Sequence, residues 1–241
     1  MGRWYYDLHL HSCLSPCGGE EVTPGDLAGM CAVAGLDIVA LTDHNTCGNC
    51  HAFAQAAEAY GLLALWGMEL TTAEEIHVIC LFPDGERGSA FSRLVYDRLP
   101  PVENDPLIFG KQTLRDCEGR VSGEEKRLLM GASHIGVNEV CGLVEKLKGV
   151  CFPAHIDRPS FSLLSQLGVW DPDLPFPLAE VSPHCPPGFS QRRDLAGIPF
   201  ITNSDTHRLA DLPDARYAME LPEKSAAAVL AWLRRGGGVD A

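Results

Sequence analysis

The sequence predicts an α/β fold in which parallel strands are joined by crossover helices. Two observations support this: strand-like and helix-like stretches alternate along most of the 241 residues, and four strand-like runs end in histidine or carboxylate side chains. A single α/β barrel has about this length, so one domain over residues 1–241 is expected. In such a barrel the carboxyl ends of the strands share one face, where these side chains would meet.

The elements follow in chain order. A strand is expected at Trp4–His9, and a helix should start after Thr23, because Pro24 suits the first helical position. Gly35 and Gly61 stand where the first two helices should end. The other expected elements are the strands Asp37–Leu41, Leu62–Met68, Ile76–Phe82, Gly149–Ala154, Leu178–Val181 and Ile198–Ile201, and the helices His51–Tyr60 and Glu223–Arg235.

One stretch, at about residues 84–148, breaks the alternation. It contains helical pieces, the pair Pro100–Pro101 and a charged run at Gly123–Arg127. We interpret it as an insertion or lid over the strand ends, within the same domain.

Charge and cysteine content exclude some classes of function. The formal net charge of −13 argues against non-specific binding to duplex nucleic acid, which needs clustered Lys and Arg. The N-terminus Met1–Asp7 shows no apolar leader, and no window is long and apolar enough to span a bilayer. We therefore expect a cytoplasmic protein without a membrane partner, whose ten cysteines are mostly reduced. Four cysteines in apolar runs are expected to be buried small hydrophobes: Cys31, Cys80, Cys141 and Cys151.

Histidine and carboxylate residues at the strand ends predict a metal site. A strand directs residues i and i+2 to one face, so His9 and His11 can bind one ion, and so can Asp205 and His207. Imidazole and carboxylate suit zinc, manganese or iron. A single histidine is more often structural, but eight such residues stand at or near strand ends: His9, His11, His44, Glu69, His77, His155, Asp205 and His207.

Five motifs in order along nearly the whole chain resemble the PHP (polymerase and histidinol phosphatase) family. The motifs are DLHLHS at 7–12, LTDHN at 41–45, GME at 67–69, PAH at 153–155 and NSDTH at 203–207. The resemblance implies a distorted (β/α)7 TIM-like barrel, two or three divalent metal ions (Zn, Mn or Fe), and hydrolysis of phosphate esters.

The resemblance also implies three metal sites. The ligands would be His9, His11, Asp205 and a bridging Glu69 at the first, Glu69, His77 and His155 at the second, and His44, His207 and one loop residue at the third. Cys17 stands where the family usually has that loop ligand, His or Asp. It is either a thiolate ligand, which favours zinc or iron, or a loop residue of no consequence. Asp7 and Asp43 are expected to orient histidines.

Three residues are candidates for catalysis. Arg158 follows His155 by three residues, where a family branch of small nucleotide phosphatases and short-RNA exonucleases has a phosphate-binding arginine; a surface position is the alternative. His134 keeps the histidine of that branch's Arg-x-His motif but lacks the arginine, so a role at the leaving group and a structural role both stay open. His207, or a coordinated water, is the candidate to protonate the leaving oxygen.

Three other features are weaker signals. Cys47–His51 matches the haem c attachment pattern, which we reject because it opens a helix directly after a metal motif. Glu180 and His184 either line the pocket or are ordinary loop residues, and Arg192–Arg193 either contacts an anionic substrate or faces solvent.

The preferred function is hydrolysis of a phosphomonoester in a small nucleotide or metabolite, by water activated at a di- or trinuclear metal site. The alternative is an exonuclease or phosphodiesterase that acts on short oligonucleotides. A non-catalytic metal-binding module that serves a partner protein is the alternative from another class. An amidohydrolase is disfavoured, because no strand-end lysine is evident. The oligomeric state is left open.

Overall fold

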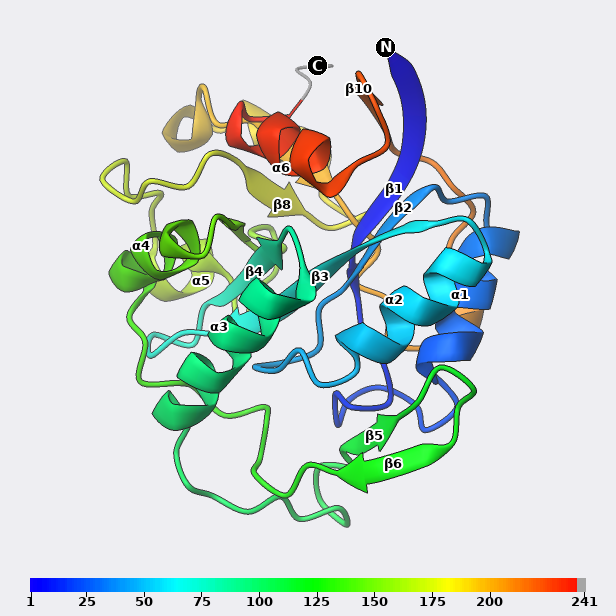
Figure 1. Ribbon diagram of the computed structural model, residues 1–241. Coiled ribbons are helices and arrows are strands. Elements are labelled where there is room, and N and C mark those ends of the chain that lie inside the picture. The colour runs from blue at the N-terminus through cyan, green and yellow to red at the C-terminus, as the bar shows by residue number, and fades with distance from the viewer. Residues whose placement is uncertain (238–241) are drawn as a thin grey trace.

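The computed structural model describes residues 1–237, so residues 238–241 of the expected domain lie outside the described part (Figure 1). The strands are β1 (Gly2–Leu10), β2 (Ile38–Leu41), β3 (Leu63–Thr71), β4 (His77–Phe82), β5 (Thr113–Arg115), β6 (Val121–Glu124), β7 (Val150–Pro153), β8 (Ala179–Val181), β9 (Phe200–Thr202) and β10 (Ala218–Leu221). The helices are α1 (Pro24–Val33), α2 (Cys50–Ala59), α3 (Gly85–Arg98), α4 (Val137–Lys146), α5 (Leu163–Leu167) and α6 (Ala226–Arg234), with 3-10 turns η1 (Phe189–Gln191), η2 (Arg193–Leu195) and η3 (Leu209–Asp211).

The strands form a curled, half-barrel sheet. Six strands run in the order β10-β1-β2-β3-β4-β7, and β8 and β9 make a separate parallel pair. Single backbone hydrogen bonds link this pair to the larger sheet. Ile156 N–H, after β7, donates to the Glu180 carbonyl in β8, and His11 N–H, after β1, donates to the Thr206 carbonyl after β9. The structure therefore confirms a mixed α/β fold, and the count of seven β/α units remains a prediction.

The direction of β4 differs from the expected parallel arrangement. β1, β2 and β3 run parallel, whereas β4 pairs antiparallel with both β3 and β7. The connection between β3 and β4 is too short for a crossover, which needs a dozen or more residues. As a result the start of β4, at His77, lies beside Thr71 at the end of β3. A histidine at the beginning of one strand thus reaches the same edge as residues at the ends of the others.

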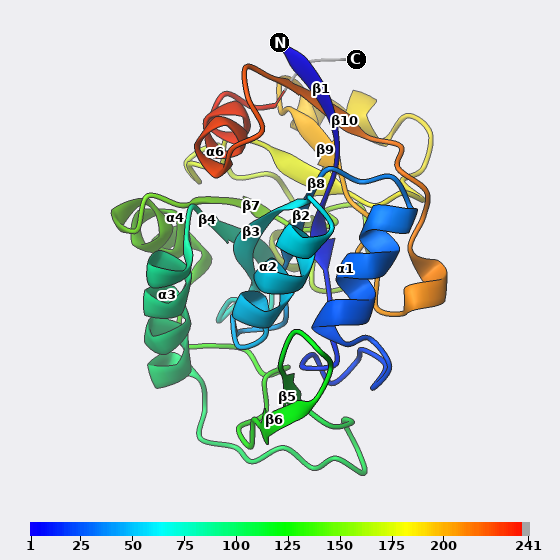
Figure 2. The same cartoon turned by 45° about the vertical axis from the view of Figure 1, so that its right-hand side comes forward.

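Alternate residues of the strands face two different apolar clusters. On β4, Ile79 and Leu81 join the cluster that contains the α6 residue Leu230, whereas Val78 and Cys80 join the cluster packed by α1, α2 and α3. In both views α6 covers the end of the sheet where β1 begins, and the β5–β6 hairpin lies at the opposite end (Figures 1 and 2). Apolar side chains therefore fill the interior of the curled sheet at the end covered by α6, and polar residues lie at the end nearer the β5–β6 hairpin.

The stretch at about 84–148 contains α3, the β5–β6 hairpin and α4. Helix α3 packs on β3 and β4, and α4 packs on β7, so both cover the outer face of the sheet. The part between them joins the loops after β1 and β2: Thr113 N–H donates to the Cys13 carbonyl, and the Asn45 amide donates to the Leu129 carbonyl. Its action as a lid remains a prediction.

Local signals confirmed most of the expected elements. Thr23 caps α1 by accepting from Asp26 N–H with Pro24 in the first turn, and Ser225 caps α6 in the same way. Strand β10, at the sheet edge, was not expected from the sequence.

Among the residues that the structure describes, no helix combines the length and apolar content needed to cross a bilayer.

Candidate metal centre

Six imidazoles form a continuous chain at the end of the sheet opposite α6. Their ring centroids lie 4.1 Å apart for His207 and His11, 4.7 Å for His11 and His44, and 5.1 Å for His44 and His77. The chain continues through His155, 5.5 Å from His77, to His9, 5.9 Å from His155. Glu69 and Asp205 contact these imidazoles. The six histidines and two carboxylates that the sequence singled out as metal ligands therefore all meet at this end of the sheet.

Glu69 lies inside this chain of imidazoles, and each of its oxygens faces a different set of nitrogens. Oε1 lies 2.8 Å from His77 Nδ1, 3.2 Å from His155 Nε2 and 3.4 Å from His9 Nε2. Oε2 lies 2.9 Å from His44 Nδ1 and 3.2 Å from His11 Nε2. The glutamate is only 1% exposed. A bridging position between metal sites is consistent with this geometry.

Three groups of side chains have ligand atoms close enough to share one ion. The groups are His9, His11, Glu69 and Asp205; His44, Glu69 and His77; and His11, His44 and His207. The first matches the expected set. The second has His44 in addition to His77, with His155 at its edge, and the third has His11 where the sequence placed Cys17. Cys17 is exposed, with its thiol beside the His44 imidazole.

The donor set fits divalent ions. Two ligand atoms that each lie about 2.0–2.2 Å from one ion are about 3.0–3.5 Å apart. His9 Nε2 and His11 Nε2 are 3.1 Å apart, and Asp205 Oδ1 lies 3.1 Å from the first and 3.2 Å from the second. Within the described residues, three buried atoms of these side chains have no aligned hydrogen-bonding partner: His44 Nδ1, His155 Nδ1 and Asp205 Oδ1. His155 presents its other ring nitrogen, Nε2, to Glu69. His44 Nδ1 and Asp205 Oδ1 are therefore buried polar atoms in the ligand groups that hydrogen bonds leave unsatisfied.

Charge in the centre is balanced by protons when no ion is bound. Burial disfavours the charged imidazoles, but nearby carboxylates raise the pKa of His11 and of His44 to about 9 and that of His9 well above its usual value. Burial by itself would raise the pKa of Glu69, but the surrounding imidazoles hold that pKa well below the usual range. Divalent cations would replace these protons, because metal binding requires neutral imidazole.

Hydrogen bonds behind the histidines fix their orientation. Both oxygens of Glu180 accept from His9 Nδ1, at 3.0 and 3.1 Å, and the Asn203 amide donates to Glu180 Oε2 at 2.7 Å. Ser15 Oγ lies 3.0 Å from His11 Nδ1 and donates to Asp43 at 2.7 Å. Such contacts present the other ring nitrogen to an ion. Asp43 therefore acts on His11 through a serine, which the sequence did not reveal.

Two of the convergent residues have strained backbone. His155 has φ of 29° and Asp205 has φ of 55°, in the left-handed region that favours glycine. Such conformations cost about 1–3 kcal/mol each and persist only where surrounding contacts hold them. His155 N–H donates to Glu180 Oε1 at 3.1 Å, so the same carboxylate that anchors His9 also holds this turn.

Other predicted residues lie at the rim or away from the centre. Arg158 Nη1 lies 2.5 Å from Asp205 Oδ2, with its side chain 40% exposed. His134 and His184 are exposed, and among the described residues neither belongs to a group of possible metal ligands. Arg192 pairs with Asp194, and Arg193 is exposed. In the haem-like motif, Cys47 and Cys50 are buried, and both thiols donate to the Gly67 carbonyl.

Asp7 and Phe161 complete the surroundings. Asp7 accepts from the N–H groups of His9 and Ser204, and burial raises the pKa of its carboxyl to about 6. Phe161 stacks on His77 with ring centroids 4.7 Å apart, and its carbonyl accepts from His77 N–H. No motif pointed to Phe161, because its contact depends on the loop after β7.

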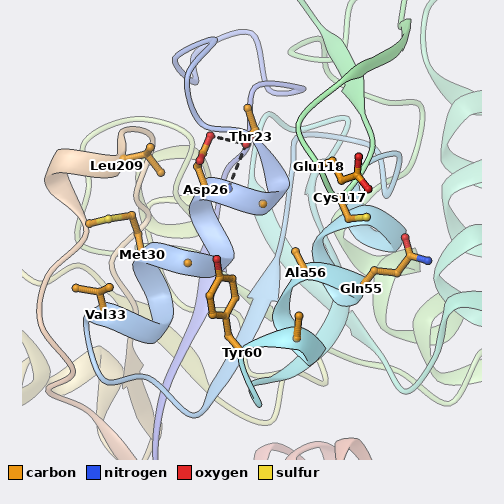
Figure 3. Close-up of a pocket in the computed structure, with 13 residues that line it drawn as sticks. Thr23, Asp26, Met30, Val33, Gln55, Ala56, Tyr60, Cys117, Glu118 and Leu209 are labelled. Carbon is orange, nitrogen blue, oxygen red and sulfur yellow. Dashed lines mark hydrogen bonds between the residues drawn. The ribbon is translucent and has the colours of Figure 1, made fainter.

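A separate groove of about 650 Å³ lies between α1 and α2 (Figure 3). Its lining includes Met30, Tyr60, Cys117 and Leu209, and none of its lining residues belongs to the metal centre.

An imidazole-rich centre around a buried carboxylate, at one end of a curled α/β sheet, is a set of side chains that could hold divalent metal ions. The model of the PHP domain matches residues 7–166, so the chain belongs to the PHP domain family. No curated protein matches the sequence.

Solved structures with the same fold are distant in sequence. The lesion-specific endonuclease PfuEndoQ from Pyrococcus furiosus is 16% identical with a TM-score of 0.67, and the match covers 98% of this chain and 57% of that one. A protein termed a metal-dependent phosphoesterase, from Bifidobacterium adolescentis, is 21% identical with a TM-score of 0.61, and 97% of each chain is covered. An amidohydrolase from Chromobacterium violaceum is 17% identical with a TM-score of 0.55, over 92% of this chain and 93% of that one. These likenesses show the fold, and this chain spans little more than half of the endonuclease.

Proposed function

We propose that the protein hydrolyses a phosphomonoester of a small nucleotide or metabolite, with two or three divalent ions at the imidazole-rich centre. The position of Glu69 carries the proposal. Its two oxygens face separate nitrogens 2.8–3.4 Å away, as a carboxylate that bridges two ions would. Paired ions bridged in this way are a common device of phosphate-ester hydrolysis.

The ions would be held by the eight residues already described. One ion would be bound by His9, His11, Asp205 and Glu69. A second ion would be bound by Glu69, His77 and His155, and His44 would lie next to both ions. A third site would consist of His44, His207 and either His11 or Cys17. Zinc, manganese and iron all suit this mixture of imidazole and carboxylate, and a thiolate would favour zinc or iron.

Divalent ions in such a site lower the pKa of bound water and neutralise charge on the phosphate oxygens. Phosphoryl transfer depends chiefly on orientation and charge stabilisation. The contribution of the chain itself would be to hold the metal-binding side chains in fixed positions. Glu180 and Ser15 hold the His9 and His11 rings in place before substrate arrives.

His207 suits ion binding better than proton donation. Its Nδ1 lies 2.9 Å from the carbonyl oxygen of Asp205, so that nitrogen donates there and Nε2 keeps its lone pair. We therefore propose His207 as a ligand, and leave protonation of the leaving oxygen to water. His134, with its exposed side chain, remains a weaker candidate for that step.

Arg158 is the proposed phosphate-binding residue. Its guanidinium contacts Asp205 at the rim while the side chain stays 40% exposed, so it can turn towards a substrate that enters from solvent. A guanidinium can make two parallel hydrogen bonds to a phosphate, which suits a terminal, doubly charged group.

A phosphodiesterase that acts on short oligonucleotides is the second candidate. One solved structure of endonuclease Q contains a 27-mer duplex substrate with an abasic lesion at the active site; it is 15% identical with a TM-score of 0.68. This chain covers 58% of that protein, so a DNA substrate remains an alternative.

Rates on paired substrates test the proposal. The protein loaded with manganese or zinc should hydrolyse an aryl phosphomonoester and nucleoside monophosphates faster than an aryl phosphodiester or short oligonucleotides, and a chelator should abolish the activity. Glu69→Gln should be inactive, whereas Glu220→Gln, on the exposed side of β10, should match the wild type. Faster hydrolysis of diesters would favour the second candidate, and no hydrolysis of any phosphate ester would contradict both.

A further inference from the structure

Two cysteines form a close pair on the outer face of the sheet, away from the metal centre. Cys141 lies on α4 and Cys151 on β7, and their sulfur atoms are 3.4 Å apart. The contact joins a helix to the strand on which it packs. The sequence predicted both residues to be buried small hydrophobes, but Cys141 is only partly buried.

The two thiols differ in their access to solvent. Cys141 and Cys151 both line a groove of about 510 Å³, whose polar residues include Asn138, Glu145 and Arg234. Cys151 is 3% exposed, so a small reagent that enters the groove meets Cys141 first.

The hydrogen bond between the thiols also distinguishes their chemistry. The Cys151 thiol donates to Cys141 Sγ, which lowers the pKa of Cys141 and raises that of Cys151 well above its usual value. A thiol that forms thiolate more readily and is more accessible is the better attacking group.

We propose that Cys141 and Cys151 are a dithiol that a hydroperoxide oxidises to a disulfide, with Cys141 as the attacking sulfur and Cys151 as the resolving one. The Cys141 thiolate attacks the outer peroxide oxygen, the O–O bond breaks, and the other oxygen leaves as an alcohol or water after taking up a proton. Cys151 sulfur then attacks the sulfenic acid on Cys141, its thiol proton goes to the departing oxygen, and water leaves. The two thiols lose two electrons and the peroxide gains them.

The geometry permits this step with a small movement. The sulfur atoms must approach from 3.4 Å to the disulfide distance of about 2.05 Å, a shift that rotation about the two side-chain bonds can supply. The product would join α4 to β7, the strand that leads to His155. Cys151 belongs to the cluster on the outer face of the sheet, so the disulfide would form behind the metal ligands.

Other cysteine pairs lack one of these features. Cys80 lies opposite Cys151 across the β4–β7 ladder, but it is fully buried. Cys47 and Cys50 are buried as well, with both thiols turned to the Gly67 carbonyl. Oxidation of the native protein should therefore select the pair Cys141 and Cys151.

Peptide mapping of the metal-loaded protein after treatment with hydrogen peroxide tests the proposal. The wild type should lose the mass of two hydrogens and yield one cross-linked peptide containing Cys141 and Cys151, which a dithiol reductant separates. Cys151→Ser should stop at a sulfenic acid on Cys141, trapped by dimedone, and Cys80→Ser should form the same disulfide as the wild type.

The expected disulfide in the wild type is the decisive result, and it does not depend on any variant folding. A cross-link between Cys80 and Cys151 or between Cys47 and Cys50 would overturn the proposal. So would oxidation of Cys141 that stops at the sulfenic acid while Cys151 is present.

Discussion

Glu180→Gln tests whether the residues behind the histidines control metal binding. In the native protein the Glu180 carboxylate accepts from three donors: His9 Nδ1, His155 N–H and the Asn203 amide. Glutamine keeps the shape of the glutamate side chain but replaces one carboxylate oxygen with an NH₂ group. That group cannot accept a hydrogen bond, so it leaves one of the donors without an acceptor. It also removes the negative charge that favours the orientation of the His9 ring.

The magnitude follows from these contacts. Hydrogen bonds to a charged acceptor contribute about 1.5–3 kcal/mol and neutral ones about 0.5–1.5 kcal/mol, and a buried unsatisfied donor costs about 1–3 kcal/mol. The free energy of unfolding should therefore fall by about 2–4 kcal/mol. Loss of a carboxylate behind a metal-binding histidine should weaken the affinity for the ion at His9 by about 10–100-fold.

Competition with a chromophoric chelator measures the affinity, and urea unfolding measures the stability. Glu220→Gln is the matched control, because that glutamate is exposed on β10. An affinity and a free energy of unfolding equal to those of the wild type in Glu180→Gln would refute the reasoning.

Three further outcomes are expected. Arg158→Ala should lower kcat/KM for phosphomonoesters by about 10–100-fold and leave metal content unchanged, because it removes a charge-assisted contact to phosphate; unchanged kcat/KM would make Arg158 a surface residue. If Cys17 is a ligand, it should resist alkylation in the metal-loaded protein and react after chelation, and Cys17→Ser should lose one ion; equal alkylation rates would make it a loop residue. Because the pKa of His11 and of His44 is raised to about 9, both are protonated near neutral pH and an ion must displace those protons. Metal affinity should therefore rise from about pH 6 to about pH 8, with proton release in calorimetry, and a flat profile would contradict this assignment.

The sequence predicted the convergence of the ligands, because strand ends and the i, i+2 spacing of His9 and His11 are local signals. It did not predict the antiparallel direction of β4, although the short stretch between Thr71 and His77 allows only a hairpin.

The residues that orient the ligands could not be predicted in the same way. Glu180 contacts His9 across 171 positions of the chain, and Ser15 acts on His11 only because its loop returns to Asp43. Such contacts depend on how the sheet curls, and no local spacing encodes them. The pair Cys141 and Cys151 was missed for the same reason, since it joins a helix to a strand.

Metal content measured together with hydrolysis tests the central claim most directly. Elemental analysis of the purified, metal-supplemented protein should find two or three divalent ions per chain. Glu69→Gln should lose most of them along with the activity on phosphate esters, because both carboxylate oxygens contact imidazoles that the ions would share. Less than one ion per chain in the wild type, or hydrolysis that persists in the presence of a chelator, would contradict the account.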